Sequence, residues 1–362
     1  MKEVSMVPVR LVLQDGSIFH GKQFGFPESV AGEVVFNTAM TGYPESITDP
    51  SYKGQILVLT YPLIGNYGVP DDISEDGISR YFESERIQVS GLVISDYSVD
   101  HHHWNARESL SDWLSENKVP GIYGIDTRAL TKRLRERGTM LGKIIVNERD
   151  VDYFDPNLEN LVAQVSIRER TVYGKGKYRI LLVDCGVKHN IIRHLLSRDT
   201  TVIRVPWDHD LSREDYDGLF ISNGPGDPKK CEAAISQLSI AIKGGKPVFG
   251  ICLGNQLLAL AAGADTYKLK YGHRSHNQPV QLANSPRCFI TSQNHGFAVD
   301  EKTLPPEWET LFTNLNDFTN EGLRHRKWPV FSAQFHPEAS SGPTDTGFLF
   351  DEFLSLIRKS LE

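Results

Sequence analysis

The stretch Lys246-Pro-Val-Phe-Gly-Ile-Cys-Leu-Gly-Asn-Gln256 decides the fold of the second half of the chain. A short apolar run enters a Gly-x-Cys-x-Gly turn, and a helical pattern follows at once. This order predicts a strand, a tight elbow and a helix, with Cys252 at the elbow. The glycines permit a strained backbone and the close approach of a substrate. The helix begins with unpaired N–H groups and a positive dipole end, which favour a thiolate. We therefore interpret Cys252 as a nucleophile and not as a small buried apolar residue.

Length and composition indicate a globular protein with two domains. The chain has 362 residues, more than one ordinary core holds, and it is 40% hydrophobic and 23% charged. Its net charge of −7 comes without long charged runs, so we expect no nucleic-acid partner. Four cysteines lie far apart without a CxxC pair. This spacing favours a cytoplasmic location over a disulfide framework or a zinc site.

Two local patterns invite other interpretations. Residues 247–264 carry no charge and approach the length of a membrane span, but they contain Gly250, Gly254 and two amides. We expect a strand, a turn and a helix there, and no membrane contact. The triple histidine at 101–103 suggests a metal site. Consecutive residues cannot all converge on one ion, and no Cys or acidic partner has ligand spacing nearby, so we predict no metal.

The chain divides into two halves that differ in their sequence pattern, and we expect these halves to be domains at residues 1–174 and 178–362. Residues 148–177 are polar and interrupted, as in a linker. The first half predicts a smaller mixed α/β domain. Its expected elements are a hairpin over 7–22, strands at 56–59 and 87–95, and helices at 110–114 and 128–137.

The second half alternates between strands and helices. This alternation predicts an α/β domain with a largely parallel sheet flanked by helices. The expected elements are strands at 180–183, 201–205, 218–222 and before Cys252, and helices at 188–197, 231–243 and 345–359.

A nucleophilic cysteine needs a base and a group that orients the base. His336 ends the expected strand 329–336 and is followed by Pro337 and Glu338. Pro337 disfavours helical geometry at His336, so His336 and Glu338 should project to the same side. Such a carboxylate fixes the tautomer of the imidazole and stabilises its charged form. A solvated His-Pro turn is the alternative. His295 is a rival base, but it lacks a carboxylate two residues on.

The turn Asn223-Gly-Pro-Gly-Asp-Pro228 follows another apolar strand. Gly224 and Gly226 allow main-chain N–H groups to approach a small ligand or an oxyanion, although a plain tight turn is the alternative. The turn has no Gly-Lys-Ser/Thr ending and no helix directly after it, so a phosphate loop is not expected.

Together, the motifs at 250–256, 223–228 and 336–338 resemble a class I (triad) glutamine amidotransferase domain. That family hydrolyses glutamine through a cysteine thioester and passes the ammonia to a synthase. The resemblance implies that Cys252 is the nucleophile, His336 the general base and acid, and Glu338 the orienting group. It also implies an oxyanion hole made by the N–H groups of Leu253 and Gly224.

The first half resembles the small chain of carbamoyl-phosphate synthases, on the motifs at 40–52, 60–66 and 124–128. The similarity runs from about Leu11 to the C-terminus. One departure is Asn255, where many members have His. Because this position is outside the triad, we expect activity to survive. The resemblance further implies contacts to L-glutamine from Ser51, Gly224, Gly226, Leu253, Gln256, Asn294, Gly296 and Phe297.

The resemblance also implies a large synthase subunit, which would be the partner in a heterodimer. That partner would bind ATP and magnesium and use bicarbonate for arginine or pyrimidine biosynthesis. This chain has no ATP-binding signature, so we expect no cofactor in it. In ammonia-using members Ser replaces the nucleophile, so Cys252 favours glutamine dependence. The chain ends soon after the amidotransferase domain, which favours a separate subunit, while a fragment of a fused polypeptide stays open.

Three other functions stay open at this point. The chain could supply ammonia to a different synthase, serve as a non-catalytic regulatory or scaffolding subunit, or act as a stand-alone cysteine hydrolase. The intact Cys-His-Glu set weighs against a silent site. The leading domain weighs against a stand-alone hydrolase, because it has no evident purpose without a partner.

Overall fold

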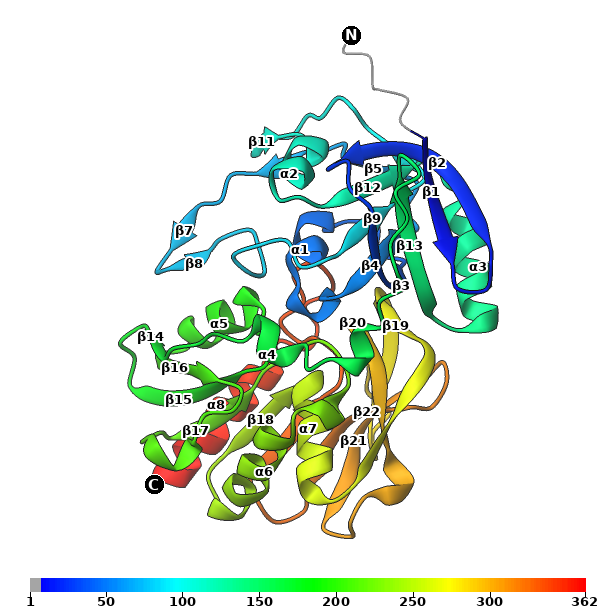
Figure 1. Cartoon of the computed structure of the whole chain (residues 1–362). Helices are drawn as coiled ribbons and strands as arrows, with labels where there is room; N and C mark the ends of the chain where they lie inside the picture. The colour runs from blue at the N-terminus through cyan, green and yellow to red at the C-terminus, as the bar shows by residue number, and fades with distance from the viewer. Residues whose placement is uncertain (1–7) are drawn as a thin grey trace. The chain divides into compact units, whose positions relative to one another are not determined.

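The computed structural model describes residues 8–362, so residues 1–7 of the expected first domain and hairpin lie outside the described residues. The chain forms two compact units, which Figure 1 shows as ribbons. The first contains the residues up to Glu75 together with Ser79–Glu159. The second contains Asp76–Ile78 and Asn160–Glu362. Apart from the short segment Asp76–Ile78, the chain passes from the first unit to the second after Glu159, inside the expected linker.

The first unit is built on a closed barrel in the order β1-β13-β3-β4-β9-β12-β2. Alternate residues of β1, such as Val9 and Leu11, are buried, as a strand with one face inward requires. Closure leaves the barrel without an open edge. The barrel strands are β1 (Pro8–Leu13), β2 (Ile18–Gly25), β3 (Val30–Asn37), β4 (Gln55–Leu59), β9 (Gly91–Val93), β12 (Pro120–Tyr123) and β13 (Met140–Val146).

Helices and short strands complete this unit. The expected helix after Asp126 is confirmed. It starts there because the Asp126 side chain accepts a hydrogen bond from the N–H of Ala129 and so caps the helix. The helices are α1 (Tyr43–Thr48), α2 (Leu110–Glu116) and α3 (Thr127–Arg137). The short strands are β5 (Leu63–Ile64), β6 (Val69–Pro70), β7 (Ser74–Glu75), β8 (Ile78–Ser79), β10 (Asp96–Tyr97) and β11 (Ala106–Glu108), of which Ile78 in β8 is grouped with the second unit.

The second unit is built on a ten-stranded sheet in the order β14-β16-β15-β17-β18-β23-β22-β21-β19-β20. Strands β16 to β23 in this order run parallel, and the flanking strands pair antiparallel. The strands are β14 (Thr171–Tyr173), β15 (Tyr178–Asp184), β16 (Thr200–Pro206), β17 (Gly218–Ile221), β18 (Val248–Ile251), β19 (Asp265–Leu282), β20 (Cys288–Asp300), β21 (Trp308–Asn314), β22 (Asn320–His325) and β23 (Val330–Ala333).

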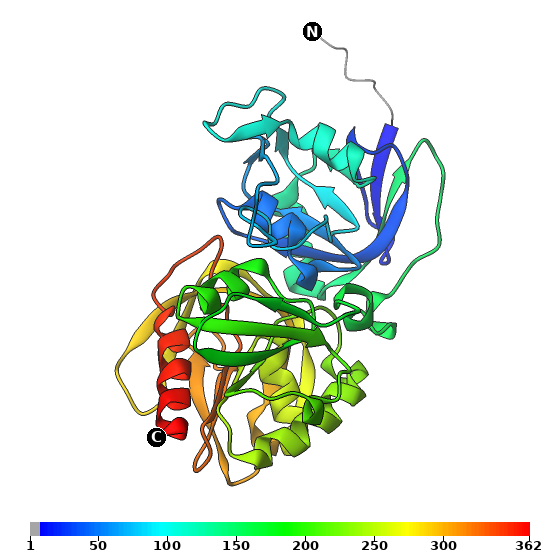
Figure 2. The ribbon, with the colours of Figure 1, turned by 90° about the vertical axis from the view of Figure 1, so that its left-hand side faces the viewer.

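Helices cover both faces of the parallel strands. Ile180 and Leu182 of β15 pack with α5 and α8, whereas Leu181 and Val183 pack with α6 and α7. Figure 2 shows α8 in red on one side of these strands and the yellow-green helices on the other. The expected parallel α/β arrangement is therefore present in this unit. The helices are α4 (Val162–Val165), α5 (His189–Leu196), α6 (Glu232–Ala241), α7 (Leu253–Ala262) and α8 (Phe348–Leu361).

The uncharged stretch 247–264 forms β18, the turn at Cys252 and α7, as expected. Between residues 8 and 362, the longest apolar helices all fall short of what a membrane crossing needs.

Candidate functional site

Cys252 occupies a strained elbow between β18 and α7. Its backbone has φ +54° and ψ −103°, a region that side-chain-bearing residues rarely adopt. The turn is possible because Gly250 and Gly254 pack backbone against backbone: a Cβ on Gly254 would lie 2.4 Å from the carbonyl oxygen of Ile221. The Cys252 side chain is buried, and its Sγ lies 3.6 Å from the carbonyl oxygen of Asn294.

His336 and Glu338 face each other, as their two-residue spacing predicted. The Nδ1 of His336 lies 2.7 Å from Oε1 of Glu338, and both side chains are buried. The expected strand ends earlier than predicted, at Ala333, and His336 is held by a hydrogen bond of 2.9 Å from its N–H to the carbonyl oxygen of Ser292. The Nε2 atom of His336 is buried and has no hydrogen-bond partner among residues 8–362.

Charges around the imidazole favour its protonated form. Burial lowers the pKa of His336, but the carboxylate of Glu338 and the sulfur of Cys252 raise it, to about 10 overall. Burial raises the pKa of Glu338, whereas Lys188 and His336 lower it, to about 2 overall. Both shifts favour the form in which His336 is an imidazolium and Glu338 a carboxylate.

Lys188 is a buried cation that no sequence motif marks. Its Nζ lies 3.2 Å from Oε1 of Glu338 and donates a hydrogen bond of 2.6 Å to the carbonyl oxygen of Ala339. The main-chain N–H of Lys188 donates a hydrogen bond of 3.0 Å to Oδ1 of Asn223. Lys188 precedes α5 and lies far from Glu338 in sequence, so only the fold brings them together. This cation holds the orienting carboxylate in place.

The turn at Gly224 lies against the start of α7. A Cβ on Gly224 would lie 2.1 Å from the carbonyl oxygen of Cys185 and 2.8 Å from Cδ2 of Leu253. The two residues expected to form the oxyanion hole are therefore neighbours. Gly226 has φ +83°, which favours glycine in this turn.

Gln256 is fixed by hydrogen bonds on the buried side of α7. Its Nε2 donates to the carbonyl oxygen of Phe297 at 2.9 Å and to Oε1 of Gln334 at 3.2 Å. The same Oε1 accepts a hydrogen bond of 3.0 Å from Asn255, whose own Oδ1 accepts from Ser332 at 2.8 Å. Asn255, the departure from the family pattern, is thus a fully buried part of the network that holds Gln256.

The strand segment Gln293–Phe297 runs beside the elbow and contains the predicted residues Asn294, Gly296 and Phe297. His295, the rival base, is engaged elsewhere: its Nδ1 lies 2.8 Å from the carbonyl oxygen of Phe297, and its Nε2 lies 3.2 Å from Oε1 of Gln293. Burial, followed by the charge of His273, keeps the pKa of His295 well below its usual value. His336 is therefore the better candidate for the base.

One predicted glutamine contact belongs to the other unit. Ser51 lies in the first unit, in a short 3-10 helix, and its N–H donates a hydrogen bond of 2.9 Å to Asp49. Its contact with glutamine stays a prediction. The ligand atoms of His273, His295 and Glu321, all buried in the second unit, lie within 4.8 Å of one another. Among residues 8–362, these three are the group whose ligand atoms lie close enough together to hold one metal ion.

Two family models match the chain. Residues 11–144 match the model described as "Carbamoyl-phosphate synthase small chain, CPSase domain". Residues 181–356 match the model described as "Glutamine amidotransferase class-I". The second match contains the elbow and the His336–Glu338 pair, and the first falls within the barrel unit except for residues 76–78.

Long curated proteins contain a similar stretch. The chain is 51% identical over 365 residues to "Carbamoyl-phosphate synthase (ammonia), mitochondrial" of Aquarana catesbeiana. The aligned stretch covers 99% of this chain and 24% of that protein. It is 53% identical over 355 residues to "Multifunctional protein CAD" of Squalus acanthias, which covers 96% of this chain and 16% of that protein. The chain thus spans a quarter or less of the length of these relatives.

A solved structure described as part of a putative GMP synthase of Thermoplasma acidophilum is also similar. The superposition covers 52% of this chain and 97% of the chain in that structure, with 23% sequence identity and a TM-score of 0.46.

Proposed function

We propose that this chain, which belongs to the carbamoyl-phosphate synthase small-chain family and carries a class I glutamine amidotransferase domain, releases ammonia from L-glutamine at Cys252. The observation that carries the proposal is the strained elbow at Cys252 together with a buried imidazole that lies 2.7 Å from Glu338 and whose pKa the sulfur of Cys252 raises. Nucleophile, base and orienting carboxylate are the parts of a cysteine-based acyl transfer.

In the proposed reaction, Cys252 attacks the amide carbon of glutamine as a thiolate, whose proton His336 already holds. The oxyanion accepts hydrogen bonds from the N–H groups of Leu253 and Gly224. His336, protonated beside Glu338, donates its proton to the departing nitrogen. Ammonia departs, and the acyl group remains on Cys252 as a thioester. His336 then takes a proton from water, which attacks the thioester and releases glutamate. Glu338 and Lys188 hold the imidazole in position throughout.

The ammonia is proposed to reach a large synthase component that binds ATP and magnesium and consumes bicarbonate. The product, carbamoyl phosphate, would enter arginine or pyrimidine biosynthesis in the cytoplasm. This chain supplies no cofactor of its own in the scheme. The large component is either a separate subunit in a heterodimer or a further part of a longer polypeptide.

The test compares Cys252→Ala with Cys288→Ala in the chain combined with its large synthase component. Cys288 is an exposed cysteine away from the elbow and serves as the matched control. We expect Cys252→Ala to abolish glutamine-dependent synthesis and to leave synthesis from added ammonium intact, while Cys288→Ala changes neither. Loss of both activities, or of neither, in Cys252→Ala would refute the proposal.

A further inference from the structure

Strands β19 and β20 pair irregularly around the candidate site. His273, Arg274 and Ser275 lie opposite His295, Asn294 and Gln293, and the register shifts on both sides of this short run. Such irregularities bend a strand and re-aim its side chains. The backbone ladder alone therefore fixes this part of β20 weakly, and side chains must supply the remaining constraint.

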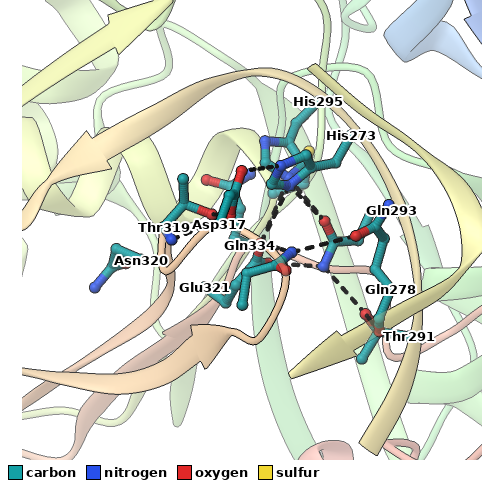
Figure 3. A network of polar contacts seen from close by, with 12 residues as sticks. His273, Gln278, Thr291, Gln293, His295, Asp317, Thr319, Asn320, Glu321 and Gln334 are labelled. Carbon is teal, nitrogen blue, oxygen red and sulfur yellow. Dashed lines mark hydrogen bonds and ion pairs between the residues drawn. The ribbon is translucent and has the colours of Figure 1, made fainter. Parts of the chain in front are cut away.

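A buried network around His273 supplies this constraint (Figure 3). The Nε2 of His273 lies 2.8 Å from Asp317, and its Nδ1 lies 2.9 Å from Oε1 of Gln293 and 3.3 Å from Oε1 of Glu321. Glu321 is fully buried and accepts hydrogen bonds from the amides of Gln293 at 3.0 Å and Asn314 at 3.1 Å. His273 thus ties β19 to β20 and β22 at a single point.

This network continues into the glutamine-binding residues that the family resemblance implies. Gln293 also contacts His295, whose Nδ1 lies 2.8 Å from the carbonyl oxygen of Phe297. The same carbonyl accepts the hydrogen bond from Gln256, and the carbonyl oxygen of Asn294 lies 3.6 Å from the sulfur of Cys252. A shift of the segment Gln293–Phe297 would therefore move several of these groups together.

A metal ion is the alternative occupant, because His273, His295 and Glu321 place ligand atoms within 4.8 Å of one another. Each of these atoms, however, already lies at hydrogen-bond distance from a protein atom. Asp317 and Glu321 also raise the pKa of His273, to about 9, against the effect of burial, so the imidazolium balances one of these two carboxylates. The geometry favours a protein-only ion pair.

We propose that His273, through its pairing with Glu321 and Asp317, is a positioning residue that fixes the segment Gln293–Phe297 for glutamine binding. The inference rests on the proposed glutamine hydrolysis. His273 touches neither the sulfur nor the base, so its loss weakens binding of substrate and transition state alike.

The experiment measures glutamate release by the full chain for His273→Gln, Glu321→Gln and the double variant. His209→Gln is the matched control, because the Nε2 of His209 lies 3.2 Å from Glu214 in the same unit. We expect His273→Gln to raise the KM for glutamine by roughly tenfold or more, with kcat nearly unchanged, because Glu321 loses its counter-charge. The double variant should have a lower KM than His273→Gln, since it removes the stranded carboxylate. The control should match the wild type.

Several outcomes would overturn the inference. These are an unchanged KM in His273→Gln, a fall in kcat alone, or a double variant whose KM equals the product of the two single effects. A stoichiometric metal in the purified wild type that is lost in His273→Gln would assign the cluster to a metal. If His273→Gln does not fold, Asp317→Asn replaces it, because Asp317 is partly exposed and its substitution disturbs the core less. This variant should also raise the KM for glutamine. A wild type that releases no glutamate, both alone and combined with its large synthase component, refutes the proposed function itself.

Discussion

At Gly224 a single missing side chain lets two backbones meet. Because a Cβ there would lie 2.1 Å from the carbonyl oxygen of Cys185, Gly224→Ala must displace the turn and its N–H group. We expect glutamate release to fall by about 100-fold or more, the cost of losing one oxyanion donor. Gly244→Ala is the control, because nothing lies within 4 Å of its Cβ position. Full activity in Gly224→Ala would exclude this N–H from the oxyanion hole.

The His336–Glu338 pair makes stability depend on pH in a defined direction. The pKa of His336 is raised to about 10 in the folded chain, from an ordinary 6.5, so its contribution is complete below pH 6.5 and is lost as pH rises through about 10. The pKa of Glu338 is lowered to about 2, so its contribution is present above pH 4.5 and is lost as pH falls through about 2.

Denaturant unfolding of wild type and His336→Gln tests this dependence. The difference in the free energy of unfolding between the two should be largest near pH 6 and should shrink steadily toward pH 10. A difference that stays constant between these two values would show that the imidazole is not held protonated in the folded chain.

Residues that act locally could be predicted, and residues that act across the fold could not. The pairing of His336 with Glu338 follows from a proline and a two-residue spacing, and the elbow at Cys252 follows from adjacent glycines. Lys188 reaches Glu338 only because β15 and β23 run in the same direction and end at the same edge of the sheet. Nothing in its neighbourhood in the sequence marks it as a counter-ion.

At the scale of elements, α7 is tied to β23 by buried amides. Asn255 donates to Gln334, the same acceptor that Gln256 uses, and accepts from Ser332. Asn255→Ala leaves buried groups unsatisfied, so we expect it to lower the free energy of unfolding by about 1–3 kcal/mol. It should also raise the KM for glutamine, because Gln256 loses a neighbour that shares its acceptor.

Calorimetry and glutamate release measure both effects. The control is Asn316→Ala, an exposed amide that donates to Gln278 at 3.0 Å and should change neither quantity. An Asn255→Ala variant with unchanged stability would show that the network relaxes around the loss.

Elements formed by neighbouring segments could be predicted from the sequence pattern, whereas pairings between distant strands could not. The hairpin of β1 and β2 and the helices α2 and α3 lie close to their expected ranges. Barrel closure pairs Val9 with Val146, and alternation along a strand does not specify a partner so distant. In the second unit, the alternating strands and helices predicted the parallel strands. The antiparallel strands between residues 265 and 325 have no α-helix between them and extend the same sheet.

At the scale of the whole molecule, each unit has its own hydrophobic core. The barrel buries Leu57 of β4, and the second unit buries Phe249 and Phe353. Ile78 precedes much of the barrel in sequence, yet its side chain belongs to the core of the second unit. A division of the chain by sequence position alone would assign it to the first half.

This assignment predicts which unit each core substitution loosens. Ile78 is 3% exposed, so Ile78→Ala should cost about 2–5 kcal/mol and speed amide exchange in β15 and β18 while β4 stays protected. Leu57→Ala should do the reverse, since Leu57 is fully buried in the core of the first unit. Ile73→Ala is the control, because Ile73 is 43% exposed. Faster exchange in β4 in the Ile78→Ala variant would place this side chain in the first core.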